Sequence, residues 1–161
     1  MNRRFALRQR GFTLIEALMV IVLIGVLLAL AAPSFRNYMA SQRVKTASFD
    51  LYATLIFARS EAIKRRVTVT VAANGGNWAT GWTVTAAGVT PALRTQDALA
   101  GVTTSGAASV VYRLDGRLTG GANIGVLIRP ETADATIPNR CIRVDLTGLP
   151  KTTTTSGTTC P

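Results

Sequence analysis

Few side chains in this sequence could perform chemistry. It contains no histidine, and its only cysteines are Cys141 and Cys160. Histidine is the usual general base of nucleophilic sites and, with cysteine, the usual ligand of zinc, so the composition argues against both kinds of site. Arg59 and Glu61 are close in sequence, but an ion pair or an interface contact explains them better than acid–base catalysis. The sequence therefore predicts no catalytic residue, no metal and no cofactor.

One carboxylate stands where a charge is costly. Glu16 is followed by residues 17–35, none of which is ionisable. On insertion scales a charged side chain at the centre of a membrane helix costs on the order of 2.5 to 3.5 kcal/mol, and somewhat less near an end. We therefore expect Glu16 to have a function of its own.

The element that holds Glu16 is predicted to be a membrane-spanning helix. At ~1.5 Å per residue a helix over residues 12–33 would be roughly 33 Å long, which is about the hydrocarbon thickness of a bilayer. Four arginines lie in the first ten residues, and they predict a cytoplasmic N-terminus with the rest of the chain outside. A secretory signal peptide cleaved at Ala29-Leu30-Ala31 and an uncleaved signal anchor are the alternatives.

The run Gly11-Phe12-Thr13-Leu14-Ile15-Glu16 resembles the prepilin peptidase site of type IV pilins and type II secretion pseudopilins. The resemblance implies that residues 1–11 are a leader cleaved after Gly11 by prepilin peptidase, and that Phe12 is then N-methylated. It also implies that Phe12 and Glu16 act in filament assembly. The new ammonium group of one subunit can pair with Glu16 of a neighbour, as buried charges generally require.

Gly25 and Pro33 fall where many pilins have helix-loosening residues. Proline lacks a backbone donor and crowds the preceding turn, so a local melting of the helix between these positions is expected. The alternative for Pro33 is that it simply ends the membrane helix.

Residues 34–66 are predicted to form an amphipathic helix that packs on the head. Its apolar residues recur every three or four positions, at Ala47, Leu51, Leu55, Ala58 and Ala62. The core Ala58-Arg59-Ser60-Glu61-Ala62 is similar to the FimT, FimU and GspH branch of minor pilins and pseudopilins. Gly81-Trp82-Thr83-Val84 resembles a strand of the same branch, in which we expect Trp82 to lie in the core.

Residues 67–161 are predicted to form a β-rich head, which makes the whole fold α+β, with one long N-terminal helix packed on an antiparallel sheet. Alternation from residue 67 and the turn Asn74-Gly75-Gly76-Asn77 predict a hairpin whose second strand runs from 78 to 86. Further strands are expected at residues 109–114, 124–128 and 140–146. Residues 90–106 are expected to be a loop with a short strand.

The cysteines are expected to form a disulfide, because an even pair outside the inner membrane lies in an oxidising compartment. Cys141 and Cys160 would close a loop around a tail rich in threonine, serine and glycine. DNA-binding FimT-type pilins carry a G-R-x-R motif in this tail, but the matching stretch here is Gly148-Leu149-Pro150-Lys151. The possible DNA contacts are therefore Arg140, Arg143 and Lys151, of which the two arginines, three apart on a strand, point to opposite sides.

The interpretation that covers the whole chain is a minor type IV pilin that primes or caps a pilus. It would be a single-pass protein of the bacterial inner membrane with a cytoplasmic leader and a periplasmic head, and would later reside in a filament. Its expected partners are other major and minor pilins or pseudopilins, prepilin peptidase and the inner membrane. The alternatives are a competence pilin that binds double-stranded DNA and the type II secretion pseudopilin GspH.

Overall fold

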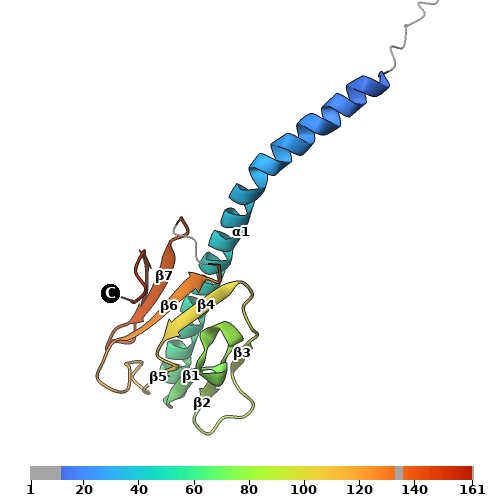
Figure 1. Cartoon of the computed structure of the whole chain (residues 1–161). Coiled ribbons are helices and arrows are strands. Elements are labelled where there is room, and N and C mark those ends of the chain that lie inside the picture. Colours follow the sequence, from blue (N-terminus) through green and yellow to red (C-terminus); the bar gives the residue numbers. More distant parts are fainter. Residues whose placement is uncertain (1–11, 133–135, 161) are drawn as a thin grey trace, which may run out of the picture. The chain divides into compact units, whose positions relative to one another are not determined.

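A computed structural model, which describes residues 12–132 and 136–160, contains one long helix and eight strands in that part of the chain (Figure 1). The helix α1 spans Leu14–Arg65, which is 52 residues. The chain divides into two compact units between Arg36 and Asn37, so α1 contributes to both. The first unit is the apolar half of α1, and the second, called the head below, contains the rest of α1 and all the strands.

Within the head, α1 buries one face completely. The buried side chains recur every three or four residues and are at most 2% exposed: Val44, Ala47, Leu51, Leu55, Ala58 and Ala62. This is the spacing of a single helical face, as the sequence predicted. The helix ends at Arg65, and Arg66 follows with a φ of 55°, the left-handed conformation that often terminates helices.

Two four-stranded antiparallel sheets form the rest of the head. The first has the order β3-β2-β1-β5 and the second the order β4-β6-β7-β8. The strands of the first are β3 (Arg94–Gln96), β2 (Trp82–Ala86), β1 (Val69–Ala73) and β5 (Ser109–Tyr112). Those of the second are β4 (Val102–Gly106), β6 (Ile124–Pro130), β7 (Asn139–Val144) and β8 (Pro150–Thr155). The α+β class and the long helix on antiparallel strands are thus confirmed.

The core lies where the inward faces of both sheets meet the buried face of α1. Trp82 is fully buried, as expected, and its indole N–H donates to the Thr54 hydroxyl on α1 at 3.2 Å. Trp78 is also buried and donates its indole N–H to the Ala107 carbonyl at 2.7 Å. The two indole rings are 6.1 Å apart. These bonds satisfy the polar atoms of the two largest core side chains.

Three predictions of local structure need correction. The hairpin forms, but short 3₁₀ turns η1 (Asn74–Gly76) and η2 (Trp78–Thr80) precede β2, which therefore starts at Trp82. The region 90–106, predicted to be a loop with one short strand, contains both β3 and β4. The tail, for which no strand was predicted, contains β8. β4 is mostly threonine, serine and glycine, and four of the six residues of β8 are threonine, so neither shows the apolar alternation that marks a strand with a buried face.

Candidate functional site

The start of α1 is organised by Thr13. Its side-chain oxygen accepts the backbone N–H of Glu16 at 3.3 Å, and its carbonyl accepts the N–H of Ala17 at 3.2 Å. This is the N-cap arrangement, and Thr13 with Glu16 three residues later matches the capping-box pattern. This role of Thr13 was not predicted from the sequence, although the spacing between the threonine and the glutamate is a sequence signal for it. Gly11 lies outside the described residues.

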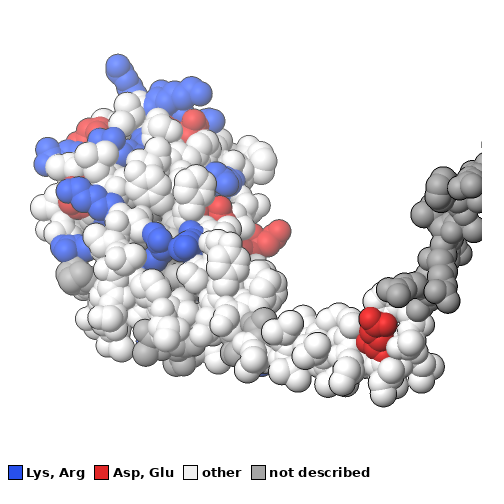
Figure 2. Space-filling view, turned by 90° about the horizontal axis from the view of Figure 1, so that it is seen from above, with Lys and Arg blue, Asp and Glu red and all other residues white. Residues whose placement is uncertain are grey.

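The first unit has an apolar surface that nothing in the first unit itself covers. Every residue from 12 to 30 is exposed, and the large apolar side chains are between 43% and 82% exposed. In Figure 2 this stretch is white apart from a red, acidic patch, and the sequence places Glu16, in the first turn of α1, as the one acidic residue of this stretch. An apolar surface of this extent marks a membrane or protein contact.

The N-terminal helix is long and apolar enough to span a membrane only when two of its stretches are taken together. Among the described residues no single helix passes a length and hydropathy test for a membrane span, but Leu14–Leu30 and Ser34–Arg65 pass as one bent pair. Gly25 and Pro33 both lie within the bounds of α1. A Cβ atom added at Gly25 would contact no other atom within 4 Å.

Arg59 does not pair with Glu61; it joins α1 to two turns of the head. Its Nε donates to the Gly116 carbonyl at 3.0 Å, in the connection between β5 and β6. One of its terminal nitrogens donates to the Thr147 carbonyl at 3.4 Å, in the β7–β8 hairpin. The two turns also touch each other, because a Cβ at Gly148 would lie 1.9 Å from the Gly116 oxygen. Arg59 therefore holds α1 to both turns, and this set of contacts is called the clasp below.

Glu61 is held by the last turn of α1. It is 8% exposed, and Arg65 donates to its carboxylate at 2.5 Å while the Lys64 ammonium lies 3.8 Å away. The hydrogen bond from Arg65 lowers the pKa of Glu61 below its ordinary value. In the part of the chain that the structure describes, no group of three metal-binding side chains occurs. Because Ala58 and Ala62 are fully buried and Arg59 and Glu61 bond within the head, the Ala58–Ala62 motif serves packing and cohesion of the head.

The predicted disulfide is present. Cys141 in β7 and Cys160 in the tail are joined, with their Cα atoms 5.4 Å apart. The tail returns over the outer side of the second sheet, where Cys160 would be 3.0 Å from a Cβ atom added at Gly125 of β6. Asn139 supports this path by donating to the Gly157 carbonyl at 3.1 Å. The disulfide therefore fixes the chain beyond β8 to β7.

The three possible DNA contacts do not share one face. Arg143 and Lys151 are directly opposite each other across β7 and β8, and both are exposed. Arg140 is half-buried and alternates with Arg143 along β7, so it points to the side that faces α1. Lys151 also has an acidic neighbour, since its ammonium is 4.0 Å from the Asp145 carboxylate. On the face of the head seen in Figure 2, basic residues are scattered with acidic ones among them.

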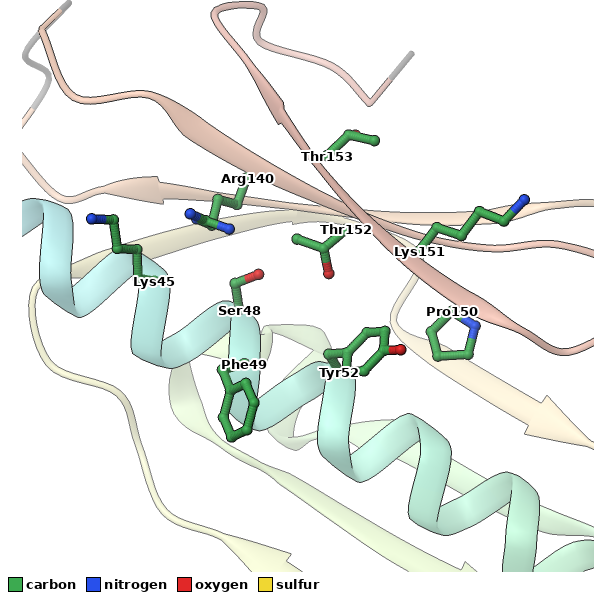
Figure 3. Close-up of a pocket in the computed structure, with 9 residues that line it drawn as sticks. All are labelled: Lys45, Ser48, Phe49, Tyr52, Arg140, Pro150, Lys151, Thr152 and Thr153. Atoms are coloured by element: carbon green, nitrogen blue, oxygen red, sulfur yellow. The ribbon is translucent and has the colours of Figure 1, made fainter.

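A groove runs between α1 and β8. Figure 3 shows its two walls: Lys45, Ser48, Phe49 and Tyr52 come from α1, whereas Arg140, Pro150, Lys151, Thr152 and Thr153 come from β7 and β8. Its volume is about 610 Å³. None of the residues that line the groove is acidic. The groove could not be predicted from the sequence, because its wall β8 was not predicted.

Two family models match this sequence. The model described as Type II transport protein GspH matches residues 47–148, which is well over half of the chain. The model of the prokaryotic N-terminal methylation motif matches residues 7–32. The two matches cover the helix start, the clasp and most of the head.

Relatives and solved structures agree with these matches. The fimbrial protein EcpB of Eikenella corrodens is 40% identical over 47 residues, which is 29% of this chain and 30% of that protein. A fimbrial protein of Pseudomonas aeruginosa is 36% identical over 64 residues, 40% of this chain and 42% of that protein. The chain thus spans less than half the length of these relatives.

The crystal structure of the type IV minor pilin FimU of Pseudomonas aeruginosa has a similar fold. The TM-score is 0.60 at 20% sequence identity, and the match covers 68% of this chain and 87% of that one. A second crystal form of the same protein gives a TM-score of 0.59 at 22% identity, with 70% of this chain and 93% of that one covered.

Proposed function

This chain belongs to the GspH family of type IV pilin-like proteins, and from that premise we propose that it is a minor type IV pilin that primes or caps a pilus. The observation that carries the proposal is the exposed, largely apolar surface of residues 12–30, whose one ionisable residue is Glu16. Such a surface needs first a membrane and then other subunits of the same kind. The family is a structural one, and its members assemble with other pilins.

We assign the chain's route into the filament as follows. Residues 1–11 keep the N-terminus in the cytoplasm, residues 12–33 anchor the chain in the inner membrane, and the head folds in the periplasm. Residues 34–66 form the amphipathic part of α1 that packs on the sheets, and residues 67–161 supply the sheets. Prepilin peptidase cleaves after Gly11, and Phe12 becomes the N-methylated first residue. Loosening of α1 at Gly25 and Pro33 accompanies assembly.

Glu16 is proposed to pair with the Phe12 ammonium of a neighbouring subunit. A charged group in an apolar filament core needs a partner of opposite charge, and the Glu16 carboxylate and the Phe12 ammonium can be partners of each other. The capping contact offers a competing role, because a carboxylate in the first turn also stabilises a helix. The two roles predict different outcomes for conservative variants.

The test uses full-length variants produced in place of the natural protein in a piliated cell. Glu16→Gln keeps the hydrogen-bonding capacity of a capping box and loses the charge, whereas Thr13→Ala loses the cap and keeps the charge. We expect the Gln variant to be cleaved and membrane-inserted but missing from sheared filaments, and the Ala variant to be incorporated. Glu131→Gln, in the head, is the matched control for loss of one carboxylate.

The opposite result would assign Glu16 to the helix cap: Gln incorporated normally and Thr13→Ala excluded. Mass spectrometry of the mature N-terminus checks cleavage and methylation in each variant. Incorporation into a secretion pseudopilus and not a pilus would favour the second candidate, a type II secretion pseudopilin, which the description of the matching family model supports.

Binding of double-stranded DNA by the head is a further candidate, supported by the exposed pair Arg143 and Lys151. The full chain in non-ionic micelles should then bind a labelled duplex, with affinity that falls as salt is raised. Replacing both residues by Gln should abolish binding, whereas Arg140→Gln should have little effect because Arg140 lies on the other side of β7. Equal effects of both changes would contradict this interface.

A further inference from the structure

The outer edge of β8 is open. β8 is the last strand of its sheet, and within residues 12–132 and 136–160 no strand pairs with its side away from β7. Across the hairpin, Asp145 donates its backbone N–H to the Leu149 carbonyl at 3.4 Å, which makes these two residues a hydrogen-bonded pair. Such pairs alternate with non-bonded ones in an antiparallel ladder, so Thr152 and Thr154 direct their N–H and C=O groups to the open edge.

That edge faces the groove beside α1. Pro150 and Thr152 lie on the side of β8 that faces α1, and Lys151 and Thr153 lie on the other side, yet all four line the groove. A single groove can touch both faces of a strand only along its edge. Figure 3 shows β8 passing across the groove, with the helix residues Ser48 and Tyr52 on the opposite wall.

The groove is also positively charged. Lys45, Arg140 and Lys151 line it, and none of its lining residues is acidic. Figure 3 places Lys45 and Arg140 at the same end, on opposite walls. In the described part of the chain neither forms an ion pair, whereas Lys151 has only the distant Asp145 at 4.0 Å. Two like charges close together disfavour each other, and an anionic group between them removes that repulsion.

We propose that the groove binds an extended acidic segment of another polypeptide, which adds to the open edge of β8 as a further strand. Main-chain hydrogen bonds to Thr152 and Thr154 supply the pairing, and carboxylates placed against Lys45 and Arg140 supply the selectivity. Phe49, which is 69% exposed, covers the apolar side chains of the added strand. This inference concerns the head alone and does not depend on priming or capping of a filament.

A polypeptide fits this groove better than a single-stranded nucleic acid. Cations with aromatic side chains such as Phe49 and Tyr52 are also the components of single-strand sites, in which bases stack on the rings. Only a peptide backbone, however, presents donors and acceptors at the spacing of a strand edge. The two ligands are separated by what happens to the backbone of β8.

The probe is a capped peptide in which valine and glutamate alternate, titrated into the full-length chain in non-ionic detergent micelles. Amide hydrogen exchange is followed by NMR at each residue of β8. We expect saturable binding, with at least tenfold slower exchange at Thr152 and Thr154 and little change at Lys151 and Thr153, whose amides already face β7. The same peptide N-methylated at two adjacent central residues, so that neither edge is intact, should bind at least tenfold more weakly.

Charge variants complete the test. Lys45→Gln combined with Arg140→Gln should weaken binding at least tenfold, whereas Arg94→Gln with Arg117→Gln, two exposed cations outside the groove, should change it less than twofold. Thr152→Pro removes one edge donor without touching the β7 ladder and should also abolish binding. The proposal is overturned if the N-methylated peptide binds equally well. It is likewise overturned if an oligothymidylate binds more tightly than the peptide and leaves the exchange at Thr152 unchanged.

Discussion

Arg59 shows how one side chain holds together elements that are distant in sequence. It reaches from α1 to the carbonyls of Gly116 and Thr147, which belong to two turns that are themselves in contact. An arginine can satisfy two carbonyls at once because its guanidinium is a rigid fork of donors. The sequence identified Arg59 through its motif, but not its role, since the partners are backbone atoms that leave no trace in residue type.

Arg59→Met should lower the free energy of unfolding by about 1.5 to 3 kcal/mol, because hydrogen bonds to a charged donor are lost while the apolar stem is kept. Calorimetric melting of the full chain in non-ionic micelles measures this. Arg94→Met, at an exposed strand-edge position, is the matched control and should change stability by less than about 0.5 kcal/mol. Equal effects of the two changes would show that the clasp contributes nothing.

The pairing of Glu61 with Arg65 makes the head sensitive to acid. The pKa of this carboxyl is lowered in the folded chain, so the carboxylate stabilises the fold above its unfolded pKa of about 4.5. That stabilisation is lost as the pH falls from there through the folded pKa. Asp145 behaves in the same sense, because the Thr147 hydroxyl and the Leu149 and Thr147 amides hold its pKa down.

We therefore expect the melting temperature to fall below about pH 4.5 and to fall less steeply in Glu61→Gln. The difference between this variant and the natural chain should be largest near pH 7 and should shrink on acidification. Glu131→Gln, an exposed residue of the same type, should keep the natural pH profile. A constant difference across this pH range would show that Glu61 acts through packing and not through its charge.

At the scale of elements, the parts that bury an apolar face were predictable and the polar edges were not. The helix and the β1–β2 hairpin repeat apolar residues with the period of their structure, and β5, β6 and β7 contain short runs of apolar residues. β4 and β8 pair through their backbones and contribute few apolar side chains, so their existence depends on neighbours far away in sequence. The groove beside β8 was hidden for the same reason.

The disulfide between Cys141 and Cys160 is expected to stabilise β8. Replacing Cys141 and Cys160 by serine should lower the free energy of unfolding by roughly 3 kcal/mol, the chain-entropy value for a loop of about this length. Urea unfolding of the full chain measures the loss, and reduction of the natural protein should reproduce it. Amide exchange in β8 should then be faster while that in β1 and β2 is nearly unchanged. Uniform loss of protection would contradict a local role.

At the scale of the whole molecule, the two units need different surroundings. The core cluster contains no residue before Val44, whereas residues 12–30 are all exposed. The division into an apolar helix and a head could be predicted from the sequence, because residues 12–35 form one apolar block that the rest of the chain is too short to cover. What the sequence could not supply is the arrangement of subunits around that block, since this depends on other chains.

A chain that begins at Asn37 should therefore remain folded and move to the soluble fraction. Its calorimetric transition should lie within a few degrees of the head's transition in the full chain, because no buried contact of the cluster is removed. The full chain should stay in membranes after alkaline extraction. A broad or absent transition in the shortened chain would show that the first unit contributes to the stability of the head.

The paired indoles give this protein an optical signature confined to the head. Both tryptophans of the sequence are in the core, with ring centroids 6.1 Å apart and planes inclined by 57°. Transition dipoles so close and so inclined couple, which splits the indole absorption band into circular-dichroism lobes of opposite sign. Since the first unit contains no tryptophan, this couplet reports the state of the head in a lipid bilayer without a label.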